Sequence, residues 1–196
     1  MVKQKLLHPL PARIFHWVNV MAIVLLTLSG FYIHDPDILK IFGPMDRARF
    51  IHFIFMYVLI CGTIYRTGYA FIIGDWREIL LMPKDIKGFI PMAKYYLFLA
   101  DSYELDGKYN AGQKMTYTLW PVLSVVQIIT GFILYLPGRL SYLAYLVGGE
   151  INVRMIHYGV TWLFAITVAM HVYLAACSGW AMLKSIVTGY LPEDYH

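Results

Sequence analysis

The chain has 196 residues, of which 59% are apolar and only 14% are charged, and its formal net charge is +4. Soluble domains carry roughly a quarter charged residues, so this composition excludes an ordinary water-soluble domain and favours lipid as the solvent. The few basic residues are scattered among apolar runs, which is atypical of a nucleic-acid-binding surface. We therefore expect a single membrane domain over residues 1–196 that binds no nucleic acid.

Four apolar stretches are long enough to cross a membrane, at about residues 14–33, 50–73, 115–136 and 155–179. A hydrocarbon core of ~30 Å needs about 20 helical residues, and backbone groups in lipid must be satisfied within each segment. We expect Pro121 to interrupt the third stretch near its start. The predicted fold class is all-α, an integral membrane four-helix bundle.

The polar stretch from Asp75 to Lys114 separates the second and third spans. Its part from Pro91 to Ala100 is apolar enough to form a short interfacial helix on the membrane surface. The side that carries both termini and this loop holds 10 Lys and Arg residues, against 5 on the other side. The positive-inside rule therefore predicts cytoplasmic termini for a multi-pass protein of a bacterial or archaeal cytoplasmic membrane.

Histidines within spans are candidate functional residues. His16 begins the first span on the predicted cytoplasmic side, and His171 lies near the same side in the fourth. His52 and His157 both lie near the outer side. His157 and His171 are 14 residues apart, about 21 Å along a helix and close to four whole turns, so they share a helix face.

Two depth-matched histidine pairs predict two haem irons, each with two axial imidazoles from facing helices. A single histidine at a membrane edge is more often an interfacial polar residue, but two pairs of equal depth favour ligation. Cys61 and Cys177 lie in no C-x-x-C-H motif, so the predicted haems are of the non-covalent b type. His8, His34 and His196 are expected to be solvated polar residues.

One spacing recurs at three helix starts, in Arg13-x-x-His16, Arg49-x-x-His52 and Arg154-x-x-His157. An arginine one turn before a ligand lies on the same face, nearer the surface, where it could pair with haem propionates. Alternatively, arginines at helix ends extend towards water. Fourteen residues after His16 comes Gly30, which would let a macrocycle approach the backbone. Fourteen residues after His52 comes Arg66, which could pair with a propionate or extend towards the cytoplasm.

These residues also carry a resemblance. The set Arg13-x-x-His16-Trp17, His52, His157 and His171 resembles the di-haem cytochrome b subunits that anchor respiratory oxidoreductases, and the match covers nearly the whole chain. The segment 108–114, Lys-Tyr-Asn-Ala-Gly-Gln-Lys, looks like the signature of the gamma subunit of membrane-bound formate dehydrogenase. The resemblance implies haem ligation by the four histidines. It also implies a menaquinone or ubiquinone site formed by Asn110, Gly112 and His171, with Gln113 as a further candidate.

The implied role is electron transfer from an iron–sulfur subunit, joined to a molybdenum or tungsten formate dehydrogenase, through two haems to a quinone. No active site for the primary substrate is expected in this chain. Relatives in hydrogenases commonly carry a second histidine one turn after the span-two ligand; here that residue is Met56, which favours the formate dehydrogenase branch. The alternatives are a hydrogenase or a thiosulfate or polysulfide reductase subunit, a stand-alone electron carrier, and a haem-free scaffold.

Overall fold

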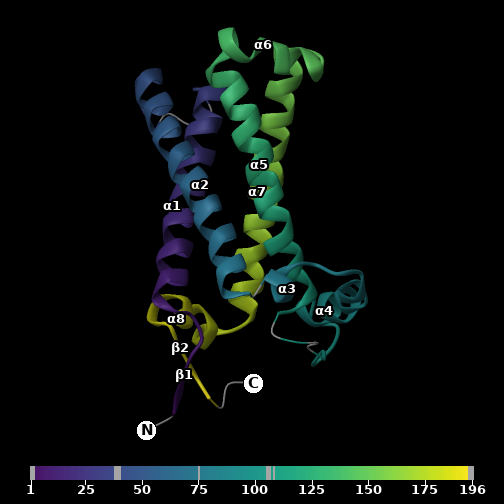
Figure 1. Cartoon of the computed structure of the whole chain (residues 1–196). Coiled ribbons are helices and arrows are strands. Elements are labelled where there is room, and N and C mark those ends of the chain that lie inside the picture. Colours follow the sequence, from purple (N-terminus) through teal and green to yellow (C-terminus); the bar gives the residue numbers. More distant parts are fainter. Residues whose placement is uncertain (1–2, 38–40, 75, 105–106, 108, 194–196) are drawn as a thin grey trace. The chain divides into compact units, whose positions relative to one another are not determined.

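The computed structural model describes residues 3–37, 41–74, 76–104, 107 and 109–193. Lys108, which opens the signature segment, and His196 lie outside this part. The described residues contain four helices long and apolar enough to cross a membrane (Figure 1). They are α1 (Leu10–His34), α2 (Met45–Ile73), α5 (Ala111–Tyr135) and α7 (Glu150–Cys177). The prediction of an all-α protein with four spans is confirmed.

Each long helix begins four or five residues before its predicted apolar stretch, because its first turn is not strongly apolar. In α1 this turn contains Pro11, a residue suited to the start of a helix. In α5 it follows Asn110, which accepts a hydrogen bond from the Gln113 amide. The expected interruption at Pro121 was wrong, because α5 continues through it. Membrane helices tolerate proline where neighbouring groups satisfy the freed carbonyl.

Shorter elements lie between and after the spans. The loop after α2 contains α3 (Trp76–Ile79), the 3-10 helix η1 (Pro83–Gly88) and α4 (Phe89–Tyr96). The helix α4 corresponds to the interfacial helix predicted at 91–100 but begins and ends earlier. The helices α6 (Pro137–Leu146) and α8 (Trp180–Thr188) and the strands β1 (Gln4–Leu6) and β2 (Tyr190–Pro192) were not predicted.

The chain divides into two compact units, one of residues 1–64 and 169–196 and one of residues 65–168. In the first unit β1 and β2 pair antiparallel, with Lys5 opposite Leu191. The backbone N–H groups of Leu7 and His8 both donate to the carbonyl of Gly189, at 2.9 and 3.1 Å. Gly189 has a φ of +94° and ends α8, a conformation that favours glycine. The N- and C-terminal segments are thus joined.

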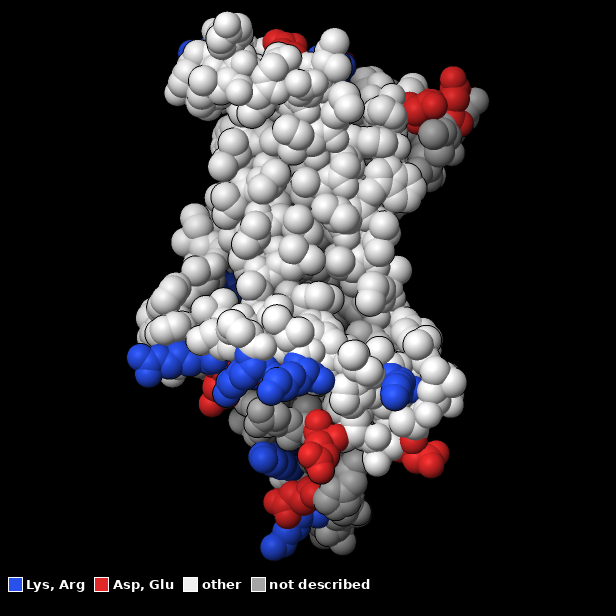
Figure 2. Space-filling view, turned by 90° about the vertical axis from the view of Figure 1, so that its right-hand side faces the viewer, with Lys and Arg blue, Asp and Glu red and all other residues white. Residues whose placement is uncertain are grey.

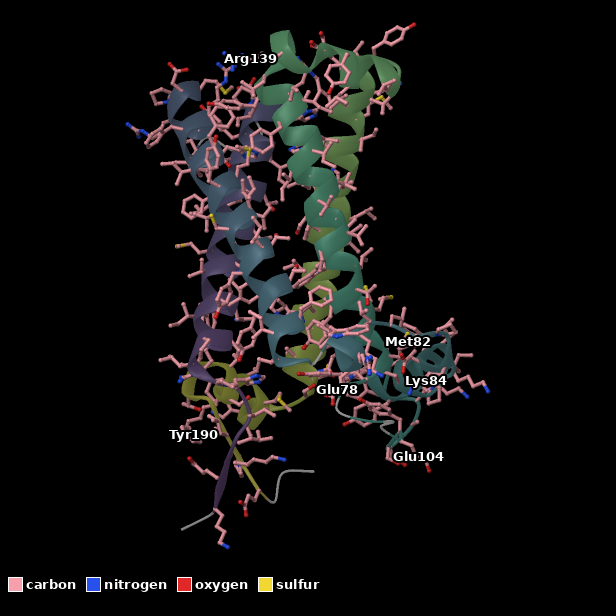
Figure 3. All side chains as sticks on the ribbon, in the orientation of Figure 1. Glu78, Met82, Lys84, Glu104, Arg139 and Tyr190 are labelled. Atoms are coloured by element: carbon pink, nitrogen blue, oxygen red, sulfur yellow. The ribbon has the colours of Figure 1, made fainter. Side chains whose placement is uncertain are left out.

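In the second unit, α6 connects α5 to α7 around a small apolar cluster of Ile133, Ala144 and Val153. At the other end of α5, the loop of η1 and α4 packs beside its first turn (Figure 1). The side-chain view shows the same arrangement, with Arg139 of α6 at one end of α5 and Lys84 of η1 at the other (Figure 3).

Candidate functional site

The structure brings His16 of α1 and His171 of α7 together in the first unit. Their ring centroids are 6.4 Å apart, and the ring planes make an angle of 53°. Two metal–imidazole bonds of about 2 Å each, extended to the two ring centres, span roughly 6 Å. The Nδ1 atom of His16 is buried without a hydrogen-bond partner in the described structure. The two rings therefore fit axial ligation of one haem iron.

His52 of α2 is oriented by a serine that sequence reasoning missed. The fully buried Ser29 of α1 places its hydroxyl oxygen 2.9 Å from Nδ1 of His52. The same hydroxyl donates its hydrogen to the Leu25 carbonyl at 2.5 Å. Since a hydroxyl has one hydrogen to donate, Ser29 must accept the Nδ1–H of His52. This tautomer leaves Nε2 with a lone pair for a metal. A Cβ added at Gly30 would lie 3.4 Å from the His52 ring, so this glycine admits the imidazole.

His157 of α7 has the same arrangement in the second unit. The hydroxyl oxygen of Thr130 in α5 lies 2.8 Å from Nδ1 of His157. Thr130 donates its own hydrogen to the Val126 carbonyl at 2.7 Å, so it too must accept the Nδ1–H and leave Nε2 for a ligand. A hydroxyl that fixes the tautomer and ring orientation of a histidine is a typical outer partner of a metal ligand.

The sequence contains only a weak signal for the two hydroxyls, because a hydroxyl residue followed by glycine also occurs at Thr67-Gly68, Ser178-Gly179 and Thr188-Gly189. Ser29-Gly30 and Thr130-Gly131 repeat a hydroxyl residue followed by glycine in the first and third spans, and each hydroxyl contacts a histidine of another span. The predicted pairing of His52 with His157 joins the two units and stays a prediction. Within the described residues, no group of three or more His, Cys, Asp or Glu could hold a metal ion. Paired imidazoles suit haem better than a bare cation.

The three predicted propionate arginines lie in different surroundings. Arg13 is half-buried and donates from Nη1 to the Val187 carbonyl at 2.6 Å, at the end of α8. Arg49 and Arg154 are exposed and lie near acidic residues of their own helices, Asp46 at 4.0 Å and Glu150 at 3.9 Å. Exposed pairs of this kind contribute little. The propionate role stays a prediction for all three.

Two further polar side chains in the second unit carry a buried atom without a hydrogen-bond partner in the described structure, Nη1 of Arg66 and Oε1 of Gln127. Gln127 was not predicted. Its Nε2 donates to the Thr161 hydroxyl at 2.8 Å and to the His157 carbonyl at 3.1 Å. Because polar groups in a span are costly unless satisfied, both residues are candidates for contact with a bound group, Arg66 with a propionate.

The predicted quinone residues of the second unit lie at the N-terminus of α5, where their polar groups already form hydrogen bonds within the protein. Asn110 caps α5, with its Oδ1 accepting from the Gln113 amide at 2.8 Å and its Nδ2 donating to the Tyr103 hydroxyl at 3.2 Å. In return, the Asn110 backbone amide donates to Oε1 of Gln113 at 3.0 Å. Burial, together with the nearby Tyr96 phenol, raises the pKa of Tyr103 to about 12, so this phenol stays neutral near pH 7.

Gly112 packs against Met92 of α4. Its amide donates to the Met92 sulfur at 3.3 Å, and a Cβ at this position would lie 3.0 Å from both the sulfur and the terminal methyl carbon of Met92. The space left by the missing side chain is therefore taken by a thioether. Met92 is flexible, so a ligand ring could replace it. His171 belongs to the other unit, and its place in a quinone site stays a prediction.

A buried ion pair holds this loop to α5. Lys114 Nζ lies 2.7 Å from Asp85 Oδ1, and the exposed fractions of the two side chains are 9% and 4%. The Met82 amide donates to the second carboxylate oxygen at 2.8 Å. The hydrogen bond from Lys114 lowers the pKa of Asp85, so the carboxylate stays charged. Buried ion pairs add little net stability but can specify one packing arrangement, here that of the loop on α5.

Four apolar spans, with two imidazoles facing each other at the separation that one iron requires, define a membrane cytochrome. The chain belongs to the prokaryotic cytochrome b561 family, whose model matches residues 7–189. It is thus a multi-pass membrane protein with b-type haem and a function in electron transport.

Curated relatives cover almost the same length. The chain is 29% identical to a probable Ni/Fe-hydrogenase B-type cytochrome subunit of Azotobacter chroococcum mcd 1, over 91% of this chain and 82% of that protein. It is 26% identical to the protein of the same description from Cupriavidus necator, over 96% and 87%. It is also 28% identical to the putative protein-methionine-sulfoxide reductase subunit YedZ1 of Azospira oryzae, over 87% and 90%.

These relatives favour the hydrogenase alternative over the formate dehydrogenase resemblance. The general expectation of a membrane cytochrome b is confirmed, whereas the specific gamma-subunit identification is not supported. Met56, the residue that separates the two branches in the sequence-based prediction, is a buried residue of α2. A buried methionine is also an ordinary packing residue, so its presence in place of histidine does not separate the two branches.

Proposed function

We propose that this chain is the cytochrome b subunit that anchors a Ni/Fe-hydrogenase-type enzyme in the membrane and delivers its electrons to a quinone. The facing imidazoles of His16 and His171, 6.4 Å apart, are the observation that carries the proposal. The hydrogenase relatives, which match over more than nine-tenths of this chain, favour this type of partner. An iron–sulfur subunit of that enzyme would be the direct electron donor.

The chain's own residues would bind and orient two haems b. His16 and His171 would ligate one iron, and His52 and His157 the other. Ser29 and Thr130 would keep the imidazoles of the second pair in the tautomer that presents Nε2. When bound, haem iron supplies one-electron transfer by changing between its ferric and ferrous states. The protein's contribution is ligation, orientation and exclusion of water.

Purification in mild detergent tests this role. We expect the chain to co-purify with a Ni/Fe-hydrogenase catalytic subunit and an iron–sulfur subunit, and a pyridine assay to count about two haems per chain. Hydrogen should reduce these haems in the isolated complex. Co-purification of a molybdenum or tungsten enzyme that makes the haems formate-reducible would contradict the hydrogenase assignment and restore the formate dehydrogenase reading. A haem count of one would contradict the two-haem arrangement.

The quinone is proposed to bind at the start of α5, where Asn110 and Gly112 lie with Gln113. Of these residues only Gln113 is exposed, and the amides of Asn110 and Gly112 already have internal partners. Binding there would require Met92 to leave Gly112 and the quinone carbonyls to accept amide hydrogens. The site would then offer hydrogen-bond donors beside an apolar wall, as small-molecule sites do.

Two variants separate binding from helix capping. Asn110→Asp keeps an oxygen for the Gln113 amide but cannot donate from Nδ2, so quinone turnover should fall while both haems and the thermal stability are kept. Gly112→Ala places a methyl group against Met92. If Gly112 serves only packing, the second change Met92→Ala should restore turnover. If a quinone ring needs this space, the double variant should stay slow. Full turnover in all of these variants would place the site elsewhere.

A further inference from the structure

The loop between α2 and α5 presents different faces to α5 and to its surroundings. Met92 and Tyr96 of α4 are buried, and Met92 contacts Gly112. The opposite side carries Ile90 and Leu97, which are seven residues apart and therefore lie on one face. They are 69% and 62% exposed. The Asp85–Lys114 ion pair fixes which side of the loop faces α5, so the apolar face points away from α5.

The turn that ends α4 has an unusual residue at its centre. The Phe98 amide donates to the Tyr95 carbonyl at 3.0 Å, and the Leu99 amide donates to the Lys94 carbonyl at 2.8 Å. This is the Schellman pattern, in which the left-handed position is usually glycine. Here it is Phe98, with a φ of +59°, a conformation unfavourable for a bulky residue. Its side chain is 81% exposed, next to Leu99 at 73%.

Basic side chains border this apolar surface. Lys84, Lys87 and Lys94 are all exposed, whereas Asp85 among them is buried and neutralised by Lys114. Of the other acidic residues in the described part of the loop, Glu78 lies on α3 before the lysines, and Asp101 and Glu104 follow the turn. Glu104 lies at the far end of the loop (Figure 3). On the face that carries the loop, Lys and Arg side chains border a large uncharged surface (Figure 2).

We propose that the turn at Leu97, Phe98 and Leu99 inserts into the lipid leaflet beside α5 and that Lys84, Lys87 and Lys94 bind anionic lipid headgroups. Exposed apolar residues bordered by lysines, here Lys94 of α4 and Lys84 and Lys87 of η1, are the composition of a segment that lies in the membrane interface. Burial of the ring in acyl chains offsets the backbone strain of Phe98, which water would not do. Anionic lipid complements the three lysines. Met92, which packs against Gly112, lies on the face of α4 opposite Leu97. The lipid contact therefore also fixes the membrane depth of the segment that covers Gly112.

Spin-label accessibility tests the insertion in the full-length, haem-loaded chain. A nitroxide is attached at Phe98→Cys, with Glu104→Cys as the matched position past the turn, both in a Cys61→Ala/Cys177→Ala background. The carrier is a lipid nanodisc of phosphatidylcholine with or without phosphatidylglycerol. The label at 98 should be more accessible to oxygen than to an aqueous nickel reagent, and the label at 104 should show the reverse. Aqueous accessibility at both positions would overturn the proposal.

A second comparison separates the effect of the Phe98 ring from the effect of the strained turn. Phe98→Gly relieves the positive φ but removes the ring, whereas Phe98→Trp retains a ring. Loss of one large lipid-buried apolar side chain should raise the rate of chymotrypsin cleavage at Phe89 or Tyr95, sites that all the variants keep, about tenfold or more in the Gly variant only. Replacement of the three lysines by Gln should raise cleavage in phosphatidylglycerol discs but leave it unchanged in pure phosphatidylcholine. Equal cleavage of the Gly variant and the wild type would contradict the insertion of Phe98 into lipid. Protection of the loop that requires another protein subunit would contradict it as well.

Discussion

The two candidate haem-binding regions are built differently. In one, the His16 and His171 rings face each other at 6.4 Å, and the Nδ1 atom of His16 has no hydrogen-bond partner in the described structure. In the other, the Nδ1 atoms of His52 and His157 each lie within 2.9 Å of a hydroxyl from a neighbouring span. The protein therefore fixes the tautomer of the second pair by its own contacts. In the first pair, no contact in the described structure fixes the tautomer of His16 through its Nδ1.

The largest effect is expected from the ligands themselves. His16→Ala should lower the haem content from about two to about one per chain, since one axial bond does not hold a haem b firmly. His52→Ala should remove the other haem, so the two variants should leave different visible spectra. His34→Ala, an exposed histidine at the end of α1, is the control and should keep both haems. Identical spectra of the His16 and His52 variants would break the division into two regions.

An intermediate effect is expected from the hydroxyls. Thr130→Val keeps the shape of the side chain but removes the hydroxyl that accepts from Nδ1 of His157, and Ser29→Ala removes the corresponding hydroxyl beside His52. Loss of such a partner typically weakens metal affinity by about 10- to 100-fold, which transfer of haem to apomyoglobin would measure. Thr130→Ser should retain haem. Thr63→Val is the matched control, because Thr63 makes the same bond to its i−4 carbonyl. Equal haem loss from the Thr63 and Thr130 variants would contradict the assigned role.

The smallest effects concern the arginines beside each region. Arg13→Gln should destabilise the chain by about 1 kcal/mol, because it removes the hydrogen bond to the end of α8. Arg49→Gln and Arg154→Gln should change stability by less than about 0.5 kcal/mol, since both are exposed. A redox titration provides the further comparison. Removal of an arginine that pairs with a propionate should lower the midpoint potential of the haem concerned, because positive charge favours the reduced form.

The sequence predicted the spans and the depth of the histidines because both depend on long, regular patterns. Apolar runs of this length indicate membrane helices, and their order along the chain places His16 and His171 at one depth. Ser29 and Thr130 were missed because hydroxyl residues in membrane helices commonly bond to their own i−4 carbonyls, as both do here. Only the neighbouring helix shows that each hydroxyl has a second, histidine partner.

The start of α5 illustrates a different limit. The motif from Asn110 to Gln113 caps the helix, but Met92 was not identified as the residue that fills the space at Gly112. Met92 comes from a helix twenty residues earlier, and no local pattern specifies such a contact. The strands β1 and β2 were missed for a similar reason, because three-residue strands carry almost no periodicity and their pairing depends on α8.

The joined ends of the first unit have a consequence for biogenesis. The bond from Arg13 to the Val187 carbonyl links positions 174 residues apart, and the Trp17 indole donates to Ile186 over a similar separation. The first span emerges from the ribosome early but cannot complete these contacts until the last helix and β2 have been synthesised. His16 likewise cannot meet His171 until the fourth span has been synthesised. Maturation of this candidate haem site would therefore follow translation and insertion of nearly the whole chain. A nascent chain stalled before α8 would leave the first span without its final partners.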